Sequence, residues 1–225
     1  MMRKNIKWLV RRHMPTFRLL NYFRLLCTSK KSYLFRTGWV KSILKGYPCD
    51  EQGNELPWMN YSFIFFIRER LKDDMALLEF GGGYSTIFWA KYVKKVYVVE
   101  HDVFFSEMLK DKSPTNVQTF LTFLNNDVPY SEHAKIVSEK NDDILFDIIV
   151  IDGIDRVDCC IKSMDYLKND GVIIWDDSIR IEYFKGFEYL YKRGFKKLEF
   201  EGIKPGDRGV DRAAIFYREK NSLNI

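Results

Sequence analysis

Three consecutive glycines and two acids are the residues of this sequence best suited to chemistry. The apolar run Leu77–Phe80 is typical of a strand, and the glycines after it let the backbone turn sharply and approach a ligand. These glycines are Gly81, Gly82 and Gly83. A second apolar run ends at Glu100, whose carboxylate can accept hydrogen bonds from both hydroxyls of a ribose. The order of strand, glycine turn, helix, strand and acid predicts a nucleotide-binding half-site.

The side chains beside the glycines distinguish the two cofactor classes that use such a half-site. A dinucleotide fingerprint requires a third small residue, and Thr86 stands at that position. Glu79, two residues before the first glycine, would repel a pyrophosphate but attract the amino group of a cationic methionine moiety. Either Ser85 or Thr86 can cap the helix that follows. The residues therefore favour S-adenosylmethionine (SAM) over a nicotinamide dinucleotide.

The glycine turn and its acids resemble the first motif of the class I SAM-dependent methyltransferases, which has the form Glu/Asp-x-Gly-x-Gly. The resemblance implies that Glu79, the glycines and Glu100 hold the cofactor. It extends from about Gly38 to Ile225, where the chain looks like a little-characterised bacterial group often associated with glycan or surface-polysaccharide assembly. That association implies a sugar hydroxyl as the methyl acceptor.

Aromatic residues just before the first predicted strand are candidates for the cofactor's sulfonium. Trp58 and Tyr61 can cover it, because a positive charge is attracted to the face of an aromatic ring. Packing in the core is an equally good use of both side chains. In folds of this type the adenine contacts come from the region 124–143, with the polar candidates Asn141, Asp142 and Asp143.

Apolar runs separated by helical patterns continue to the end of the chain. Phe146–Ile151 is almost uninterrupted, as expected of a strand in the middle of a parallel sheet that is covered on both faces. Phe195–Phe200 and Ala213–Tyr217 are expected to pair as a terminal hairpin. The sequence predicts an α/β fold, a Rossmann-like doubly wound seven-stranded methyltransferase sheet whose last strand is antiparallel. A methyltransferase domain over 46–225 would follow a basic, partly amphipathic helical extension over 1–45.

Acids follow two of the predicted strands, and they allow two kinds of chemistry. Asp152, Asp176 and Asp177 should converge at one rim of the sheet, where oxygen ligands suit Mg²⁺, Ca²⁺ or Mn²⁺ better than zinc. This resembles the catechol O-methyltransferase branch, although Asp177 stands where that branch has Asn and 153–156 lacks its catalytic lysine. The alternative is that these acids bind no metal, and that Asp176 or Asp177 caps the next helix.

Without a metal, a carboxylate can still deprotonate an acceptor hydroxyl as the methyl group transfers. Asp152 is the first candidate for this base and can also line the methyl site, and His101, beside the ribose-binding acid, is the second. Arg156 can hold an anionic acceptor through its planar guanidinium, or pair with Asp155 or Asp158.

Charge is distributed unevenly along the chain. There are 12 Lys or Arg and no acid before Asp50, against 24 basic and 31 acidic residues from Asp50 onward. The body is therefore acidic, which argues against a nucleic-acid partner. The basic leader contains an amphipathic segment after Pro15, which can contact an anionic membrane, cover the domain's own sheet or cover a partner subunit in a homo-oligomer.

No secretory signal or membrane-spanning segment is recognisable, because Lys and Arg interrupt every apolar run of the leader. The four cysteines show no metal or disulfide spacing. These features predict a cytoplasmic protein, with the inner membrane surface as the place of any membrane contact.

The sequence as a whole predicts a SAM-dependent O-methyltransferase with a carboxylate base and a small-molecule or glycan acceptor. Two alternatives stay open. One is a Mg²⁺-dependent small-molecule O-methyltransferase of the catechol type, and the other is a non-catalytic membrane-surface scaffold that retains the fold. A nicotinamide oxidoreductase is disfavoured, because Thr86 replaces the third small residue and no hydride-transfer constellation is evident.

Overall fold

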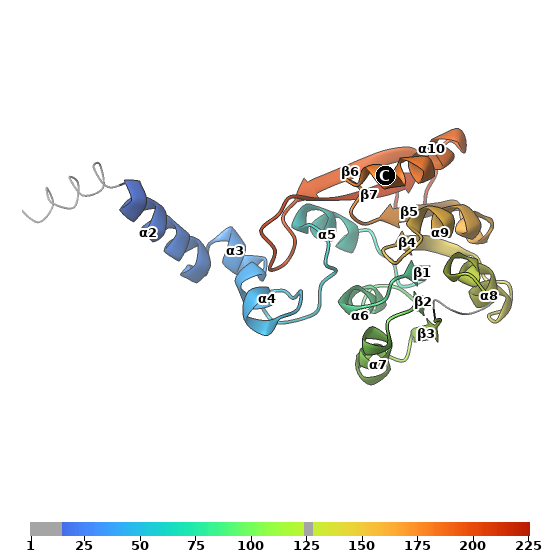
Figure 1. Ribbon diagram of the computed structural model, residues 1–225, viewed down its shortest axis with the longest axis horizontal. Coiled ribbons are helices and arrows are strands. Elements are labelled where there is room, and N and C mark those ends of the chain that lie inside the picture. Colours follow the sequence, from blue (N-terminus) through green and yellow to red (C-terminus); the bar gives the residue numbers. More distant parts are fainter. Residues whose placement is uncertain (1–14, 124–127) are drawn as a thin grey trace, which may run out of the picture.

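A computed structural model describes residues 15–123 and 128–225, so predictions that fall on 1–14 or 124–127 lie outside the described residues. Its centre is one seven-stranded sheet in the order β3-β2-β1-β4-β5-β7-β6 (Figure 1). The first five strands are parallel, and β7 runs antiparallel to both of its neighbours. The strands are β1 (Ala76–Phe80), β2 (Lys95–Glu100), β3 (Val117–Leu121), β4 (Phe146–Ile151), β5 (Leu167–Trp175), β6 (Lys196–Gly202) and β7 (Asp211–Tyr217). The predicted fold class is confirmed, including the terminal hairpin.

Helices cover both faces of the sheet. On one face α5 (Tyr61–Arg68), α6 (Tyr84–Ala90) and α7 (Val103–Lys112) supply buried side chains to one core cluster. On the other face α8 (His133–Glu139), α9 (Arg156–Ser163) and α10 (Phe184–Lys192) supply the second cluster. The two layers account for the mainly apolar sequences of the central strands β1 and β4, because successive side chains of a strand enter opposite cores.

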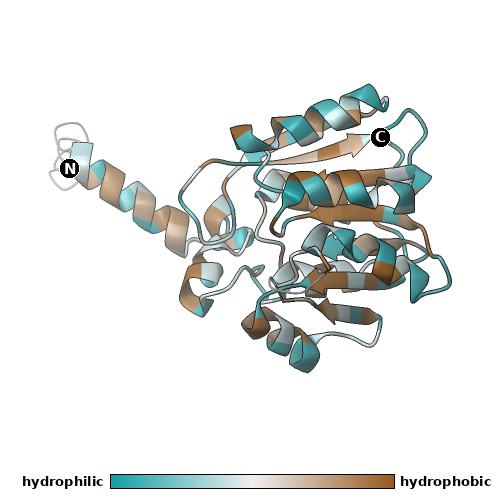
Figure 2. Ribbon diagram, turned by 45° about the vertical axis from the view of Figure 1, so that its right-hand side comes forward, coloured by the Kyte–Doolittle hydropathy of each residue, from teal (hydrophilic) through white to brown (hydrophobic). Residues whose placement is uncertain are grey.

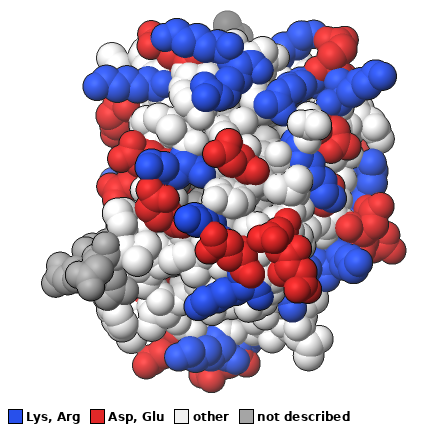
Figure 3. Space-filling view, turned by 90° about the vertical axis from the view of Figure 1, so that its right-hand side faces the viewer, with Lys and Arg blue, Asp and Glu red and all other residues white. Residues whose placement is uncertain are grey.

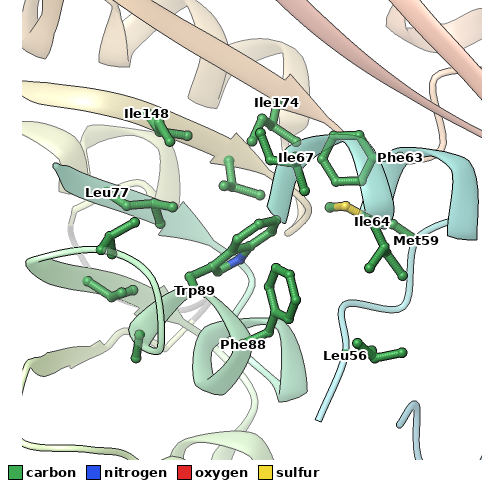
Figure 4. Packing of buried hydrophobic residues seen from close by; sticks show 14 of the residues in the cluster. Leu56, Met59, Phe63, Ile64, Ile67, Leu77, Phe88, Trp89, Ile148 and Ile174 are labelled. Carbon is green, nitrogen blue, oxygen red and sulfur yellow. The ribbon is translucent and has the colours of Figure 1, made fainter. Parts of the chain in front are cut away.

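Figure 4 shows the first core, in which the indole of Trp89 lies between the sheet and α5. Trp89 has no exposed surface, and its ring meets that of Phe63 edge-on at 6.5 Å between centroids. Leu77 of β1 and Ile148 of β4 are paired in register and belong to the same cluster. This packing fixes α6 against the end of β1, where the glycine turn begins.

In the described part of the chain, three helices precede α5, and the first of them points away from the sheet (Figure 1). They are α2 (Pro15–Thr28), α3 (Tyr33–Arg36) and α4 (Trp39–Lys45). No residue of α2 is buried, and Figures 1 and 2 show this helix extending outward with apolar and polar positions along its length. Within the described ranges, no helix is both long and apolar enough to cross a membrane. The domain division proposed between residues 45 and 46 stays a prediction.

The surface of the body differs from α2. On the face opposite that helix, basic and acidic side chains are interspersed (Figure 3). α2 itself contains two arginines and no acid.

Candidate functional site

A cavity of about 480 Å³ opens at the carboxyl ends of β1, β2 and β4. Most of the residues predicted to bind the cofactor meet at its wall: Trp58, Gly81, Gly82, Gly83, Ser85, Glu100, His101 and Asp152. Glu79, Thr86 and Tyr61 do not line it. Its other lining residues are Gly46, Pro48, Tyr84, Asp102, Phe104, Phe105, Gly153 and Ile154. Ligands of open parallel sheets bind at this end of the strands, so the cavity is the candidate cofactor site.

The glycine turn leaves bare backbone at the cavity wall. Gly81 has φ +89°, and a Cβ there would lie 2.6 Å from the amide nitrogen of Gly153. A Cβ on Gly82 would lie 2.5 Å from Val98 Cγ1. Gly83 is in extended conformation, and a Cβ there would have ordinary contacts only. The first two positions therefore require glycine so that the ends of β1, β2 and β4 can lie this close together.

Glu100 is the best-anchored acid of the cavity. Its Oε2 accepts a hydrogen bond from the amide of Gly82 at 2.5 Å, and its Oε1 accepts from the amides of His101 and Asp102 at 2.7 and 2.6 Å. The side chain is only 3% exposed, yet it lines the cavity. Because a carboxylate oxygen can accept two hydrogen bonds, Oε2 retains one acceptor position for a ligand hydroxyl.

Glu79 lies behind the glycine turn and has no exposed surface. Its Oε2 accepts a hydrogen bond from Thr86 Oγ1 at 2.5 Å, and its Oε1 accepts one from Trp89 Nε1 at 2.9 Å. Thr86 Oγ1 also accepts from the amide of Gly83 at 3.1 Å, so this hydroxyl joins the start of α6 to the acid. Burial raises the pKa of Glu79 to about 7, against the lowering effect of its hydrogen bonds. Glu79 thus holds α6 and the turn, and it does not line the cavity in which its predicted ligand contact would lie.

The three other predicted ligand contacts differ in position. His101 lines the cavity, with Nδ1 3.2 Å from Glu100 Oε1. Trp58 lines it as well and is 57% exposed. Tyr61 is instead buried, with its ring against those of Tyr33 and Phe65, so the structure places it in the packing of the N-terminal helices.

The adenine contacts predicted from Asn141, Asp142 or Asp143 are wrong. Asn141 and Asp142 line a different cavity together with Ala76 and Lys95, at the amino ends of the strands. Asp143 follows them directly, ahead of β4, so the chain must cross the sheet before it reaches the cofactor cavity. These three side chains lie at the wrong end of the sheet.

Residues that follow Glu100 directly were missed by the sequence reasoning. Asp102, Phe104 and Phe105 extend the cavity wall. Tyr130 contacts the end of β2 and a glycine of the cavity wall. Its hydroxyl donates to the carbonyl of Val99 at 2.9 Å, and the same oxygen would lie 2.4 Å from a Cβ on Gly153. Asp102, Phe104 and Phe105 could have been predicted, because they follow Glu100 within five residues in the sequence. Tyr130 comes from a segment with no recognisable motif.

Asp152 follows β4 and is held by Arg156. Its Oδ1 accepts a hydrogen bond from Arg156 Nη2 at 3.0 Å, and its side chain keeps 23% exposure. Arg156 also donates to the backbone carbonyls of Asp152, Gly153 and Asp176. Burial raises the pKa of Asp152 to about 6, although the charge of Arg156 works against the rise. Arg156 is therefore paired with Asp152 and not with Asp155 or Asp158, and it fastens the ends of β4 and β5 together.

Asp176 and Asp177, the other predicted metal ligands, lie near Asp211 of β7, and each of the three acids offers an oxygen within 4.8 Å of the others. Asp152 is not a member of this group. The ammonium of Lys204 contacts all three carboxylates, at 2.9 to 3.3 Å. Neither Asp211 nor Lys204 was recognised from the sequence. A lysine within 3.3 Å of an oxygen of each acid does not fit the predicted divalent cation.

Comparison with solved structures identifies the fold. A putative O-methyltransferase from Klebsiella pneumoniae is 13% identical, with a TM-score of 0.56 over 89% of this chain and 96% of the other. The O-methyltransferase TomG from Streptomyces achromogenes, solved with SAM, is 15% identical, with a TM-score of 0.55 over 68% and 77%. A precorrin-6y methyltransferase from Geobacter metallireducens is 15% identical, with a TM-score of 0.50 over 70% and 86%.

No protein-family model and no curated protein matches the sequence. The chain has the class I SAM-dependent methyltransferase fold. At these sequence identities the comparison supports the fold alone.

The glycine turn makes a prediction about stability. Gly81→Ala adds a methyl group that overlaps the backbone after β4, whereas Gly194→Ala, also at positive φ, has nothing within 4 Å of the new Cβ. We expect Gly194→Ala to cost about 1 kcal/mol of unfolding free energy and Gly81→Ala at least about 2 kcal/mol more. Urea unfolding followed by circular dichroism measures both. Equal losses would show that the close approach at Gly81 is absent.

Proposed function

We propose that this protein is a SAM-dependent O-methyltransferase. The observation that carries the proposal is the Glu100 carboxylate at the cavity wall, anchored by three backbone amides with one acceptor position left on Oε2. One ribose hydroxyl would donate to it, and the bare backbone of Gly81–Gly83 would face the methionine part. The cofactor would supply an electrophilic methyl group.

Asp152 is the base that we propose. Its carboxylate lines the cavity at the end of β4, and Arg156 holds it in one orientation. It would take the proton of an acceptor hydroxyl while that oxygen bonds to the methyl carbon and the carbon–sulfur bond breaks, which leaves a methyl ether and S-adenosylhomocysteine. A pKa of about 6 leaves most of this carboxyl ionised at neutral pH and so able to accept a proton. Arg156 would act as a positioning residue, and His101 is the second candidate base.

The acceptor that we propose is a sugar or glycan hydroxyl. A second cavity of about 290 Å³ shares Gly46, Pro48 and Trp58 with the cofactor cavity. The exposed indole of Trp58 gives it a flat apolar wall, against which the carbon–hydrogen face of a sugar ring can pack. A Mg²⁺-dependent enzyme of the catechol type is less well supported, because Lys204 contacts the acids that would bind the metal.

Cofactor binding tests the proposal first. Calorimetric titration with SAM, S-adenosylhomocysteine and NAD should give micromolar binding of the two adenosyl ligands alone. Glu100→Ala should weaken it at least tenfold, about 1.4 kcal/mol. Glu107→Ala, which removes an exposed acid of α7 that does not line the cavity, should leave it within about twofold. Folded protein that binds neither adenosyl ligand would favour a non-catalytic scaffold, and binding of NAD would favour an oxidoreductase.

Catalysis by Asp152 predicts a dependence on pH. Because the base works ionised, kcat/KM for an acceptor found by screening sugars should fall tenfold per pH unit below about pH 6. It should level off above that value. Asp152→Asn should lower the rate at neutral pH by about 10²- to 10⁴-fold. Release of S-adenosylhomocysteine measures both effects, and a variant that keeps the wild-type rate would rule out this base.

The N-terminal helix α2 supports a membrane-surface location for the enzyme. Its apolar side chains are 41 to 70% exposed: Phe17, Leu19, Leu20, Tyr22, Phe23, Leu25 and Leu26. On a helical projection Leu19, Phe23 and Leu26 lie on one side, and Arg18 and Arg24 lie outside that face. An apolar face flanked by cations suits the headgroup region of an anionic membrane. We propose such a surface, on the cytoplasmic side of the inner membrane, as the partner of α2.

Vesicle sedimentation of the full chain tests this location. Binding should be strong to phosphatidylglycerol-containing vesicles and weak to phosphatidylcholine alone. The double variant Leu19→Ser with Phe23→Ser should lose at least about tenfold in affinity for vesicles. It removes apolar area that would be buried in the membrane, without changing the charge. Asn21→Ser with Thr28→Ser, on the other side of the helix, should bind as the wild type does. If the apolar-face variant instead dissociates a dimer and the wild type ignores vesicles, α2 covers a second copy of the chain.

A further inference from the structure

Lys204 lies among three carboxylates from two separate parts of the chain. Its Nζ is 2.9 Å from Asp177 Oδ1, 3.2 Å from Asp211 Oδ1 and 3.3 Å from Asp176 Oδ2. Asp176 and Asp177 follow β5, Asp211 begins β7, and Lys204 belongs to the loop between β6 and β7. Several carboxylate oxygens converging on one point form the usual environment of a hard divalent cation. Here the point is taken by an ammonium group.

The cluster is well shielded from water. The side chains of Lys204, Asp176 and Asp211 are 13, 5 and 6% exposed. With three carboxylates within 3.3 Å, the ammonium of Lys204 has the ion pairs that a shielded charge needs.

A second cation adds positive charge beside the same acids. Arg156 Nη1 lies 4.0 Å from Asp176 Oδ2, and Arg156 Nη2 lies 3.8 Å from Asp177 Oδ2. A divalent ion bound at these acids would meet the positive charge of Lys204 at hydrogen-bonding range and that of Arg156 close by. It could enter only if Lys204 moved out and gave up its three ion pairs.

We infer that Lys204 takes the place of the divalent cation, so that this chain binds no metal at Asp176 and Asp177 and uses the lysine to fasten the β6–β7 loop over the strand ends. The contacts of the loop agree with this role. Trp39 Nε1 donates to the carbonyl of Asp207 at 2.6 Å, and the amide of Tyr61 donates to the carbonyl of Ile203 at 3.1 Å.

The fastened loop forms one wall of the second cavity. Pro205 and Gly206, directly after Lys204, line it together with Ser42 and Tyr47. If that cavity receives the acceptor, as the proposed function has it, the lysine acts as a positioning residue for the acceptor side. The absence of metal binding at the three acids does not depend on that assignment.

Manganese titration of the full-length wild type tests the inference. Mn²⁺ followed by electron paramagnetic resonance should show no saturable site tighter than about 1 mM, the weak end of protein-bound divalent ions. The melting temperature should be the same with Mg²⁺ and with EDTA at matched ionic strength. A tight Mn²⁺ site in the wild type that disappears in Asp177→Asn would overturn the inference, whatever the variants below do.

Removal of the lysine should convert the cluster into a cation site. Lys204→Ala should bind Mn²⁺ at least about tenfold more tightly than the wild type, since three carboxylates are left without their central cation. Its amides over 203–210 should exchange hydrogen faster, and Mn²⁺ should restore their protection. Lys185→Ala, which removes an exposed cation of α10, should change neither property.

A folded Lys204→Ala protein with wild-type loop protection and no gain in Mn²⁺ affinity would contradict the role of the lysine. If that variant does not fold, Lys204→Gln provides the same comparison. Every readout is metal binding, melting or hydrogen exchange, so failure of this inference is distinguishable from failure of the methyltransferase proposal.

Discussion

The structure depends on a small set of hydrogen bonds around the carboxylate of Glu100. Its three backbone donors belong to the turn after β1 and to the segment between β2 and α7. One side chain therefore fixes the relative positions of the elements that form most of the cavity wall. Glycine is required at the turn for the same reason, since a Cβ on Gly82 would displace Val98, two residues before this acid.

Buried charge is organised differently on the two sides of the site. Behind the turn, Glu79 is satisfied by neutral donors alone, a hydroxyl and an indole, and burial raises its pKa. Beside β4 and β5 the acids form ion pairs with basic side chains of the protein. Arg156 pairs with Asp152, and Lys204 pairs with Asp176 and Asp177. An acid that has its own counter-ion is held in place without a ligand. The geometry of the rim is thereby set before any substrate arrives.

The sequence was sufficient for the features that depend on local pattern. Apolar runs located the strands, because a central parallel strand must be apolar on both faces. The glycine turn and Glu100 could be found because a tight turn after a strand requires particular residue types at fixed spacing. Even so, the pattern did not show that the side chain of Glu79 points toward α6. Two hydrogen bonds from that helix determine the orientation of its carboxylate.

Features that arise from tertiary pairing could not be predicted. Lys204 lies 27 residues after Asp177 in the sequence, and no local motif links them. Their contact follows from the antiparallel insertion of β7 beside β5, which brings the hairpin loop over the strand ends. Of the two uses that the sequence left open for Tyr61, the structure shows packing, because Tyr33 of α3 lies against its ring. Asn141, Asp142 and Asp143 could have been excluded from the sequence, since they stand at the amino end of a predicted parallel strand.

A crystal structure of the protein grown with S-adenosylhomocysteine and Mg²⁺ would test the central claim most directly. The account predicts the adenosyl ligand in the cavity at the ends of β1, β2 and β4, with a ribose hydroxyl within hydrogen-bonding distance of Glu100 Oε2. The ammonium of Lys204 should remain among Asp176, Asp177 and Asp211. A ligand bound elsewhere, or a ribose without contact to Glu100, would contradict the assignment of this cavity as the cofactor site.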